Sequence, residues 1–404
     1  KLYNNMGAPR LGLGSWVKRN TQKFSSSNEE TMYTTVKAIF RILWITIVNL
    51  YCIPTYIIIM FVTRPLLWLS PELYWRMEGC LFRWLLMMVV HWMWSAGYTI
   101  TDCGEDIRMC TEEECLITVN HQSTGDVPTL MHCFCNKGMV PNRVFWIMDV
   151  LFKYTHFGLV SQLRGDFFIR QGKDTRHLQG KLLAQHMKES YWSRGHQWII
   201  LFPEGGFLRK RRINSQEFAE KQGLPRLEHV TLPRIGAMKT ILDIASPSAL
   251  QSNGLVRSSK KPIKWLVDIT IGYPEGKPLD MQTIAGGWRK PCTTKLYYRK
   301  YPIEEIPLDA DGMTRWLYDR FIEKEQLLKT FYATGSFHDV NSKTDIHGDN
   351  QRYLKQGIAH LMREDKIEWT WAQLLPPHLF YIITCYLSWS NIIAGIIAVY
   401  NLIV

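Results

Sequence analysis

The alternation of apolar and polar residues divides the chain into three parts. Residues 38–62 form an apolar run with one charge, Arg41, and residues 378–404 form an apolar run at the opposite end. A helix needs about 20 apolar residues to cross a bilayer, so both runs predict membrane helices, with Arg41 reaching the lipid headgroups. A third run, residues 79–98, carries an arginine and a histidine and predicts either a span or a helix at the membrane surface. Buried core helices are the alternative for all three runs.

Between these runs, residues 99–335 have the pattern of a soluble α/β domain. Runs of β-branched and aromatic residues predict strands at 115–119, 143–148, 198–202, 264–273 and 295–301. Helical periodicity predicts helices at 174–194 and 313–331, whereas residues 246–262 lack aromatic side chains and predict a loop. Such alternation of strands and helices predicts a mainly parallel sheet flanked by helices.

The expected fold is therefore α/β, with N-terminal membrane helices and a C-terminal membrane helix added to the sheet domain. Five segments are expected: a polar N-terminal segment (1–37), membrane or interfacial helices (38–98), the α/β domain (99–335), a polar linker (336–373) and the C-terminal membrane helix (374–404). The first segment lacks the apolar stretch of a cleavable signal peptide.

Composition narrows the class of partner. The formal net charge is +12, and the chain has 16 Trp and 18 Tyr. Positive charge favours nucleic acid, anionic lipid or a phosphorylated substrate. Trp and Tyr have an apolar body and a polar tip, which suits a membrane interface. The apolar runs argue against nucleic acid and favour the lipid bilayer as a partner.

Cysteine usage and the distribution of charge indicate the compartment. The nine cysteines are irregularly spaced, and Cys133 and Cys135 are one residue too close for a zinc-binding CxxC pair. We therefore expect reduced thiols and no metal site. Basic residues precede the first apolar run, and no Asn-X-Ser/Thr sequence occurs in the chain. These features predict a cytosolic N-terminus, and also a cytosolic α/β domain if the runs at 38–62 and 79–98 form a membrane hairpin.

The first candidate site is the segment TVNHQSTGDVPTL, residues 118–130. His121 follows a predicted strand, and Asp126 is the expected N-cap of the next helix. Open α/β sheets build their sites at the carboxyl ends of strands. Asp126 could hold one imidazole nitrogen so that the other can accept a proton. No serine or cysteine nucleophile accompanies the pair, so the substrate's own hydroxyl would have to attack. A structural His–Asp turn is the alternative.

A second candidate site follows the strand predicted at 198–202. There the segment FPEGGFLRKRR places Glu204, Gly205 and Gly206 before a run of basic residues that begins with Arg209. Glycines after a strand free backbone N–H groups for an anion, and arginine donors match phosphate geometry. Glu204 could hydrogen-bond a polyol or a headgroup. A solvated basic surface or a nuclear-localisation signal is the alternative for the basic run.

Two further segments carry the same kind of chemistry. RGDFFIRQGK, residues 164–173, ends an apolar run with Arg170, which suits a phosphate. VTLPRIGA, residues 230–237, places Pro233 before an arginine where a helix is expected to begin. Each segment is a weak signal by itself.

Taken in order, NHQSTGD, GDFFIR, FPEGG and TLPR resemble the four blocks of the glycerolipid acyltransferase family, whose first block is written HX4D. WIMDVLFKYTHFG and WLYDRFIEKEQLL, with the apolar ends, are similar to the lysophosphatidylglycerol acyltransferase branch over most of the chain. The resemblance implies an enzyme of the endoplasmic reticulum membrane, facing the cytosol. Acyl-CoA would be its co-substrate and a lysophospholipid its acceptor, with no other cofactor.

Carried over to this chain, the resemblance implies that His121 is the general base and Asp126 its orienting partner. Arg170 matches the second-block arginine that binds the acceptor's phosphate, and Pro233 matches the fourth-block proline.

The third block departs from the family pattern. Glu204 and Gly205 match the EG pair implicated in acceptor binding, but Gly206 and the phenylalanine after it stand where Thr and Arg are common. The phosphate contact would then pass to Arg209 or a neighbour.

These expectations predict acyl transfer to a free glycerol hydroxyl in phospholipid remodelling, with lysophosphatidylglycerol or lysophosphatidylethanolamine as acceptor. Lysophosphatidate and lysophosphatidylinositol stay open as acceptors. A thioesterase or a non-catalytic lipid-binding protein stays open as an alternative. The sequence does not decide the acylated position, the acyl chain length or the oligomeric state.

Overall fold

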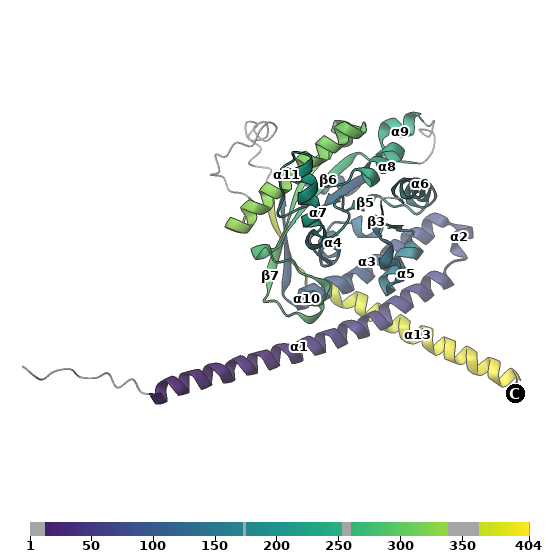
Figure 1. Ribbon diagram of the computed structural model, residues 1–404. Helices are drawn as coiled ribbons and strands as arrows, with labels where there is room; N and C mark the ends of the chain where they lie inside the picture. Colours follow the sequence, from purple (N-terminus) through teal and green to yellow (C-terminus); the bar gives the residue numbers. More distant parts are fainter. Residues whose placement is uncertain (1–12, 173–174, 253–259, 338–362, 404) are drawn as a thin grey trace, which may run out of the picture.

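The domain is built on an eight-stranded sheet, in a computed structural model that describes residues 13–172, 175–252, 260–337 and 363–403 (Figure 1). The strand order is β4-β3-β5-β2-β6-β7-β1-β8. The strands are β1 (Tyr98–Gly104), β2 (Cys115–Val119), β3 (Val144–Asp149), β4 (Phe167–Ile169), β5 (Trp198–Leu201), β6 (Trp265–Gly272), β7 (Cys292–Pro302) and β8 (Arg363–Ile367).

Most of the strand pairings are parallel, as the sequence predicted. Strand β2 pairs in parallel with β5 and β6, β3 with β4 and β5, and β1 with β7. Only the β6–β7 and β1–β8 pairs are antiparallel among the described strands. Because β2 and its two neighbours run in the same direction, their carboxyl ends meet at one edge of the sheet.

Helices cover both faces of the sheet, and β2 is buried throughout. Cys115, Ile117 and Val119 face a core that includes α3 (Pro71–Ser95) and α4 (Asp126–Phe134). Leu116 faces the opposite core, which includes α6 (Arg176–His186), α8 (Gly236–Ala245) and α11 (Ala310–Thr334). This alternation follows from the period of two along a strand.

Two long helices extend from the domain and cross each other beneath it (Figure 1). They are α1 (Leu13–Val62) and α13 (Trp371–Ile403). Within them, Met32–Val62 and Trp371–Asn401 are long and apolar enough to cross a membrane. These are the two expected membrane helices, and their solvent-facing side chains are largely apolar.

The third apolar run, residues 79–98, is neither a membrane span nor a helix at the membrane surface. Most of it lies in α3, where fourteen residues are buried, and α3 is not among the candidate spans of the described chain. A buried ion pair explains its position. Arg164 Nη1 lies 2.7 Å from Glu78 Oε1, and the Tyr56 hydroxyl of α1 donates to the same oxygen at 2.5 Å. The run is therefore a core helix, the alternative that the pattern left open.

Arg41 does not reach toward lipid headgroups. Its side chain is 8% exposed and donates to Ser95 Oγ, to the Trp92 carbonyl and to the Ile284 carbonyl at 3.0, 2.8 and 3.2 Å. The expectation was wrong because the last carbonyls of α3 offer acceptors that an arginine on α1 can reach without leaving the protein.

Three expectations about local structure also change. The described part of the expected 1–37 segment, from residue 13, is already helical in α1. The expected loop at 246–262 contains α9 (Pro247–Ser252), and residues 253–259 lie outside the described chain. The described part of the expected linker includes the edge strand β8, which begins with four consecutive charged residues and so lacks the apolar alternation of a strand. Residues 338–362 lie outside the described chain.

Candidate active site

The site begins where β2 ends. Asn120 Oδ1 accepts from the Ile271 amide at 2.7 Å, and its Nδ2 donates to the Ile271 carbonyl at 3.1 Å. The side chain therefore extends the hydrogen bonding between β2 and β6 by one step, fixing where the chain leaves the sheet. His121 follows directly at the carboxyl edge.

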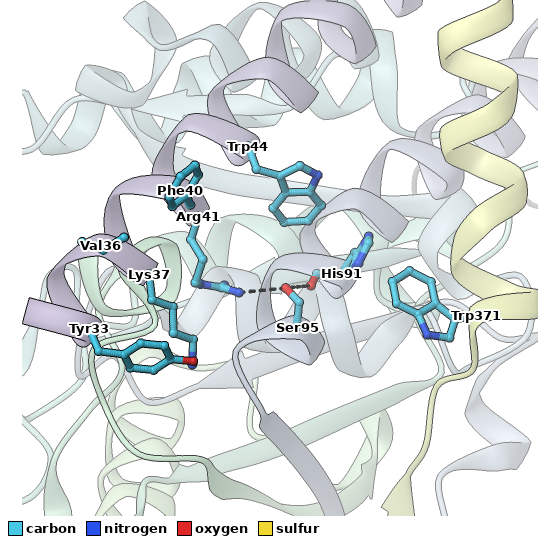
Figure 2. A pocket seen from close by; sticks show the side chains of 9 residues that line it. All are labelled: Tyr33, Val36, Lys37, Phe40, Arg41, Trp44, His91, Ser95 and Trp371. Carbon is cyan, nitrogen blue, oxygen red and sulfur yellow. Dashed lines mark hydrogen bonds between the residues drawn. The ribbon is translucent and has the colours of Figure 1, made fainter. Parts of the chain in front are cut away.

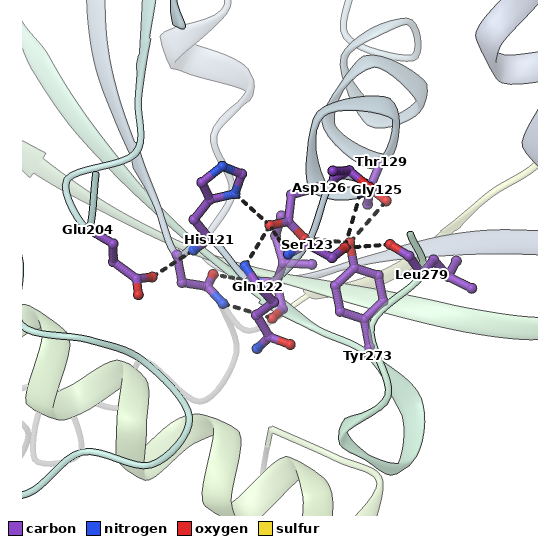
Figure 3. A network of polar contacts seen from close by, with 12 residues as sticks. His121, Gln122, Ser123, Gly125, Asp126, Thr129, Glu204, Tyr273 and Leu279 are labelled. Carbon is purple, nitrogen blue, oxygen red and sulfur yellow. Dashed lines mark hydrogen bonds and ion pairs between the residues drawn. The ribbon is translucent and has the colours of Figure 1, made fainter. Parts of the chain in front are cut away.

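His121 and Asp126 face each other across a short loop (Figure 3). His121 Nδ1 lies 2.8 Å from Asp126 Oδ2, which also accepts from the amides of Gln122 and Ser123 at 2.6 and 2.9 Å. Since an ionised carboxylate is only an acceptor, Nδ1 carries a proton and Nε2 presents a lone pair. No described residue hydrogen-bonds Nε2, so the imidazole is arranged to accept a proton there.

The position of Asp126 differs slightly from the one expected. Gly125 is the N-cap of α4, and Asp126 is the first residue of the helix, fully buried. Gly125 lies against the backbone of Leu279, where an added Cβ would come within 1.9 Å of the carbonyl oxygen. This close approach requires glycine. It brings the Leu279 segment against the loop of residues 121–126, which we call the catalytic loop because the sequence predicts a catalytic pair in it.

Tyr273 is a site residue that the sequence did not indicate. Its hydroxyl donates to Asp126 Oδ1 at 2.7 Å, and its side chain is fully buried. Burial raises the pKa of Tyr273 well above its usual range, so the hydroxyl stays a donor. Tyr273 follows β6, the parallel neighbour of β2, and that shared edge is the only signal that could have placed it here.

The hydroxyl side chains of the loop are engaged in holding its shape. Ser123 Oγ donates to the Leu279 carbonyl at 2.5 Å, and Thr124 Oγ1 accepts from the Met281 amide at 3.0 Å. Neither hydroxyl is hydrogen-bonded to His121. The described loop therefore contains an imidazole with a free Nε2 and a carboxylate bonded to its Nδ1, and no serine hydroxyl of the loop is bonded to that imidazole.

Glu204 lies beneath His121 and is 1% exposed. Its Oε1 accepts from the His121 amide at 2.6 Å, and its Oε2 accepts from the amide and the hydroxyl of Thr231 at 2.8 and 2.6 Å. Burial raises the pKa of Glu204 to about 7. Both oxygens join the first, third and fourth sequence blocks to one another, and neither points to solvent.

Two aromatic rings hold the His121 imidazole. Phe202 stacks on it with ring centroids 4.1 Å apart, and Phe207 lies against it at 4.4 Å. The Leu208 amide, at the start of α7 (Leu208–Lys221), donates to the His121 carbonyl at 2.8 Å. The ring is therefore fixed by packing as well as by Asp126, and its side chain keeps 14% exposure.

The glycine turn lies next to His121 and is flanked by arginines. Gly205 adopts a φ of +67°, a left-handed conformation that favours glycine. Arg211 Nη1 lies 3.3 Å from the Gly205 carbonyl, and its side chain packs where a Cβ of Gly206 would be. Arg234 approaches the other side of Gly205. These are the cations at the turn, where the sequence had indicated Arg209 or a neighbour.

The remaining expected residues surround this turn at different depths. Arg170 is exposed just after β4, and the next residue, Gln171, accepts from Arg211 Nη1 at 3.5 Å. Pro233 is buried, and the amide of the following residue donates to the Pro203 carbonyl at 2.9 Å. Arg209 is exposed in the first turn of α7. The sequence blocks therefore converge at the carboxyl edge, with the Arg170 and Arg209 side chains exposed.

The same region of the chain matches a known protein family. The family model described as Acyltransferase matches residues 102–232, and the one described as Acyltransferase C-terminus matches residues 287–358. Acyl-CoA:lysophosphatidylglycerol acyltransferase 1 of Homo sapiens is 48% identical over 310 residues, which cover 75% of this chain and 83% of that protein. Lysocardiolipin acyltransferase 1 of Gallus gallus is 25% identical over 290 residues, 70% of each chain.

A solved structure is also similar. The 1-acyl-sn-glycerophosphate acyltransferase of Thermotoga maritima matches with a TM-score of 0.41 at 11% identity, over 73% of this chain and 98% of that one.

Proposed function

The chain belongs to the acyltransferase family, and we propose that it transfers a fatty acyl group from acyl-CoA to the free glycerol hydroxyl of a lysophospholipid. The observation that carries the proposal is the His121–Asp126 pair, which offers a free Nε2 in a loop whose own hydroxyl groups are engaged elsewhere. A base without a protein nucleophile suits direct attack by a substrate hydroxyl.

In the proposed reaction, Nε2 of His121 takes the proton of the glycerol hydroxyl as its oxygen attacks the thioester carbonyl. Asp126 stabilises the imidazolium that forms, and Tyr273 keeps Asp126 in place. The carbon–sulfur bond then breaks, and the coenzyme A thiolate takes the proton back from His121. The ester and the free thiol are the products, and His121 returns to its starting state. A positioned base of this kind contributes about 10² to 10⁴ in rate.

Glu204 has a positioning role in this proposal. Its two oxygens accept from the backbone amides of His121 and Thr231, so the carboxylate fixes the position of the His121 backbone and with it the imidazole. We assign acceptor binding to the surface above it, where the glycine turn and its arginines are found.

The acceptor's phosphate is proposed to bind at the glycine turn. Arg211 and Arg234 flank Gly205, and Arg170 is exposed close to the residue that Arg211 contacts. Guanidinium groups bind phosphate with paired donors and stay charged at all working pH values. Burial lowers the pKa of the Arg211 guanidinium.

The proposed reaction takes place at a membrane surface. Many apolar side chains of both candidate spans are exposed. A lysophospholipid could then reach His121 without leaving the bilayer surface. We propose the cytosolic face of the endoplasmic reticulum membrane as the location, because acyl-CoA and reduced cysteines both suit the cytosol.

An acylation assay tests the proposal. Full-length protein in membranes is offered a mixture of lysophosphatidylglycerol, lysophosphatidylethanolamine, lysophosphatidate and lysophosphatidylinositol with a panel of acyl-CoAs, and products are identified by mass spectrometry. We expect a diacyl product from lysophosphatidylglycerol or lysophosphatidylethanolamine that depends on His121. Release of free fatty acid at the same rate with and without acceptors would instead make the protein a thioesterase.

A further inference from the structure

A pocket outside the catalytic site lies between the two long helices and the end of α3 (Figure 2). Its volume is about 530 Å³, within the range of small-molecule sites. Six of its nine lining residues come from one face of α1, and the others come from the end of α3 and the start of α13. None of the four sequence blocks contributes a residue to it, so the pocket is distinct from the candidate active site.

The polar groups of the pocket are cationic. Lys37 and Arg41 both line it, and none of the lining residues in the described chain is an aspartate or a glutamate. Lys37 is exposed, and no described carboxylate lies within ion-pair distance of it. Arg41 is held in place by its bonds to Ser95 and to two backbone carbonyls, which leave its charge uncompensated. The charge of the pocket therefore favours an anion.

The remaining wall is apolar and aromatic. Phe40 and Trp44 line it from α1, and Trp371 lines it from α13. The His91 ring lies between Trp44 and Trp371. Its centroid is 4.7 Å from the Trp44 ring centroid and 5.3 Å from that of Trp371. Aromatic walls can bind a quaternary ammonium group, but the cations Lys37 and Arg41 would repel one. An acyl chain or glycerol backbone is the group that such a wall would cover.

The pocket lies beside the start of both candidate spans. Lys37 is near the start of the candidate span Met32–Val62, and Trp371 is the first residue of the other span, Trp371–Asn401. Lysine and tryptophan are suited to the boundary between headgroups and acyl chains. We propose that this pocket binds one anionic phospholipid of the bilayer, with its phosphate at Lys37 and its acyl chain against Phe40, Trp44 and Trp371.

The bound lipid would be linked to catalysis through α10 (Met281–Gly286). Arg41 donates to the Ile284 carbonyl in this helix, and the Met281 amide at its other end donates to Thr124 of the catalytic loop. Lipid binding holds α1 and Arg41 against α10, and α10 braces the loop that carries His121. Anionic lipid should therefore bind in the absence of both substrates and should also raise the rate of acyl transfer.

Lipid retention by the full-length protein tests the site independently of the enzyme's reaction. The protein is reconstituted in nanodiscs of phosphatidylcholine with or without phosphatidylserine, extracted into detergent, and examined by native mass spectrometry without substrates. We expect one phosphatidylserine to remain bound to the wild type. Val36→Trp fills the pocket and should abolish retention, and Lys37→Gln should weaken it about fivefold, the effect of one basic side chain near anionic lipid.

Two variants serve as matched controls. Ile39→Trp adds the same ring to an α1 residue that does not line the pocket, and Lys181→Gln removes an exposed lysine from α6. Both should retain phosphatidylserine as the wild type does, and a thermal unfolding midpoint checks that every variant is folded. Equal retention by wild type, Val36→Trp and Lys37→Gln would overturn the proposal. So would equal retention of phosphatidylcholine, or binding that requires lysophospholipid or acyl-CoA.

Discussion

The catalytic loop and the glycine turn are neighbours, yet they hold their polar groups in opposite ways. In the loop, Asp126 is fully buried and accepts bonds from an imidazole, two amides and a tyrosine. At the turn, Arg234 and Arg170 are exposed. The catalytic loop is therefore ordered before substrate binds, as a proposed general base requires. The glycine turn keeps its charges available for an anion that the protein itself does not contain.

This contrast predicts that substitutions in the loop lower the rate constant, whereas substitutions at the turn weaken substrate binding. A change in kcat with unchanged KM reports loss of an interaction made in the transition state, and a change in KM alone reports loss of binding common to both states. Substitutions in each region test that division.

The largest effect is expected for His121→Ala. The fold should persist, because His121 bonds Glu204 and Leu208 through its backbone amide and carbonyl, and alanine keeps both groups. We expect kcat to fall by about 10³, the usual contribution of a positioned base. Acyl-transfer rates and the unfolding midpoint are compared with those of His177→Ala, an exposed histidine of α6. A His121→Ala rate within tenfold of the wild type would exclude the proposed base.

Glu204→Gln should have the next largest effect. A glutamine amide places N–H donors against an amide or the Thr231 hydroxyl, so one buried bond is lost, at a cost of about 1–3 kcal/mol in stability. We expect kcat to fall about tenfold as the start of the catalytic loop shifts.

The same variant has a pH dependence with a definite sign. The pKa of Glu204 is raised from 4.5 to about 7 by burial, so the folded protein binds more protons than the unfolded chain between those values. Its contribution to the free energy of unfolding therefore decreases as pH rises through that window, by on the order of 3 kcal/mol in total. Glutamine does not titrate. The stability advantage of the wild type over Glu204→Gln should narrow from pH 5 to pH 8, and a gap that widens would contradict the assignment.

Tyr273→Phe tests a residue that acts only through Asp126. Removing the hydroxyl leaves Asp126 Oδ1 without its buried donor. We expect kcat to fall about fivefold, since a hydrogen bond contributes roughly 1 kcal/mol, with KM for both substrates unchanged. Tyr154→Phe, at an exposed tyrosine, is the control. A purely structural role would lower the unfolding midpoint without this separation of kcat from KM.

The smallest effect is expected for Arg211→Gln at the glycine turn. We predict a KM for the lysophospholipid about fivefold higher, a nearly unchanged kcat and a weaker dependence on salt, because one partly exposed cation is lost. Arg212→Gln, at the exposed neighbouring position, should change little. Equal effects of the two variants would mean that general surface charge, rather than the turn, attracts the acceptor.

The sequence predicted the centre of the sheet better than its edges. The strand expected at 115–119 is β2 without change, since an uninterrupted apolar run bounded by polar residues has one plausible structure. β4 has only three residues and β8 is largely charged, so neither carries a pattern that distinguishes a strand from a loop. The acyltransferase family expected from the four blocks is confirmed by the relatives.

Within the site, the separation in sequence decided what could be foreseen. His121 and Asp126 are five residues apart, so their contact could be proposed from local geometry. Tyr273 is 147 residues from Asp126, and its contact depends on β6 lying beside β2. The Arg41 bond to Ile284 spans 243 residues and depends on the position of α1 beneath the domain. Such contacts follow from tertiary packing, which local patterns do not specify.

The central claim is that the attacking oxygen belongs to the lipid and not to the protein. Full-length protein mixed with acyl-CoA alone should keep its unmodified intact mass and release no coenzyme A thiol. Thiol release should begin only when lysophospholipid is added, in step with formation of the diacyl product. An acyl-protein adduct in the intact-mass spectrum, formed before any acceptor is present and consumed when the acceptor is added, would contradict the account.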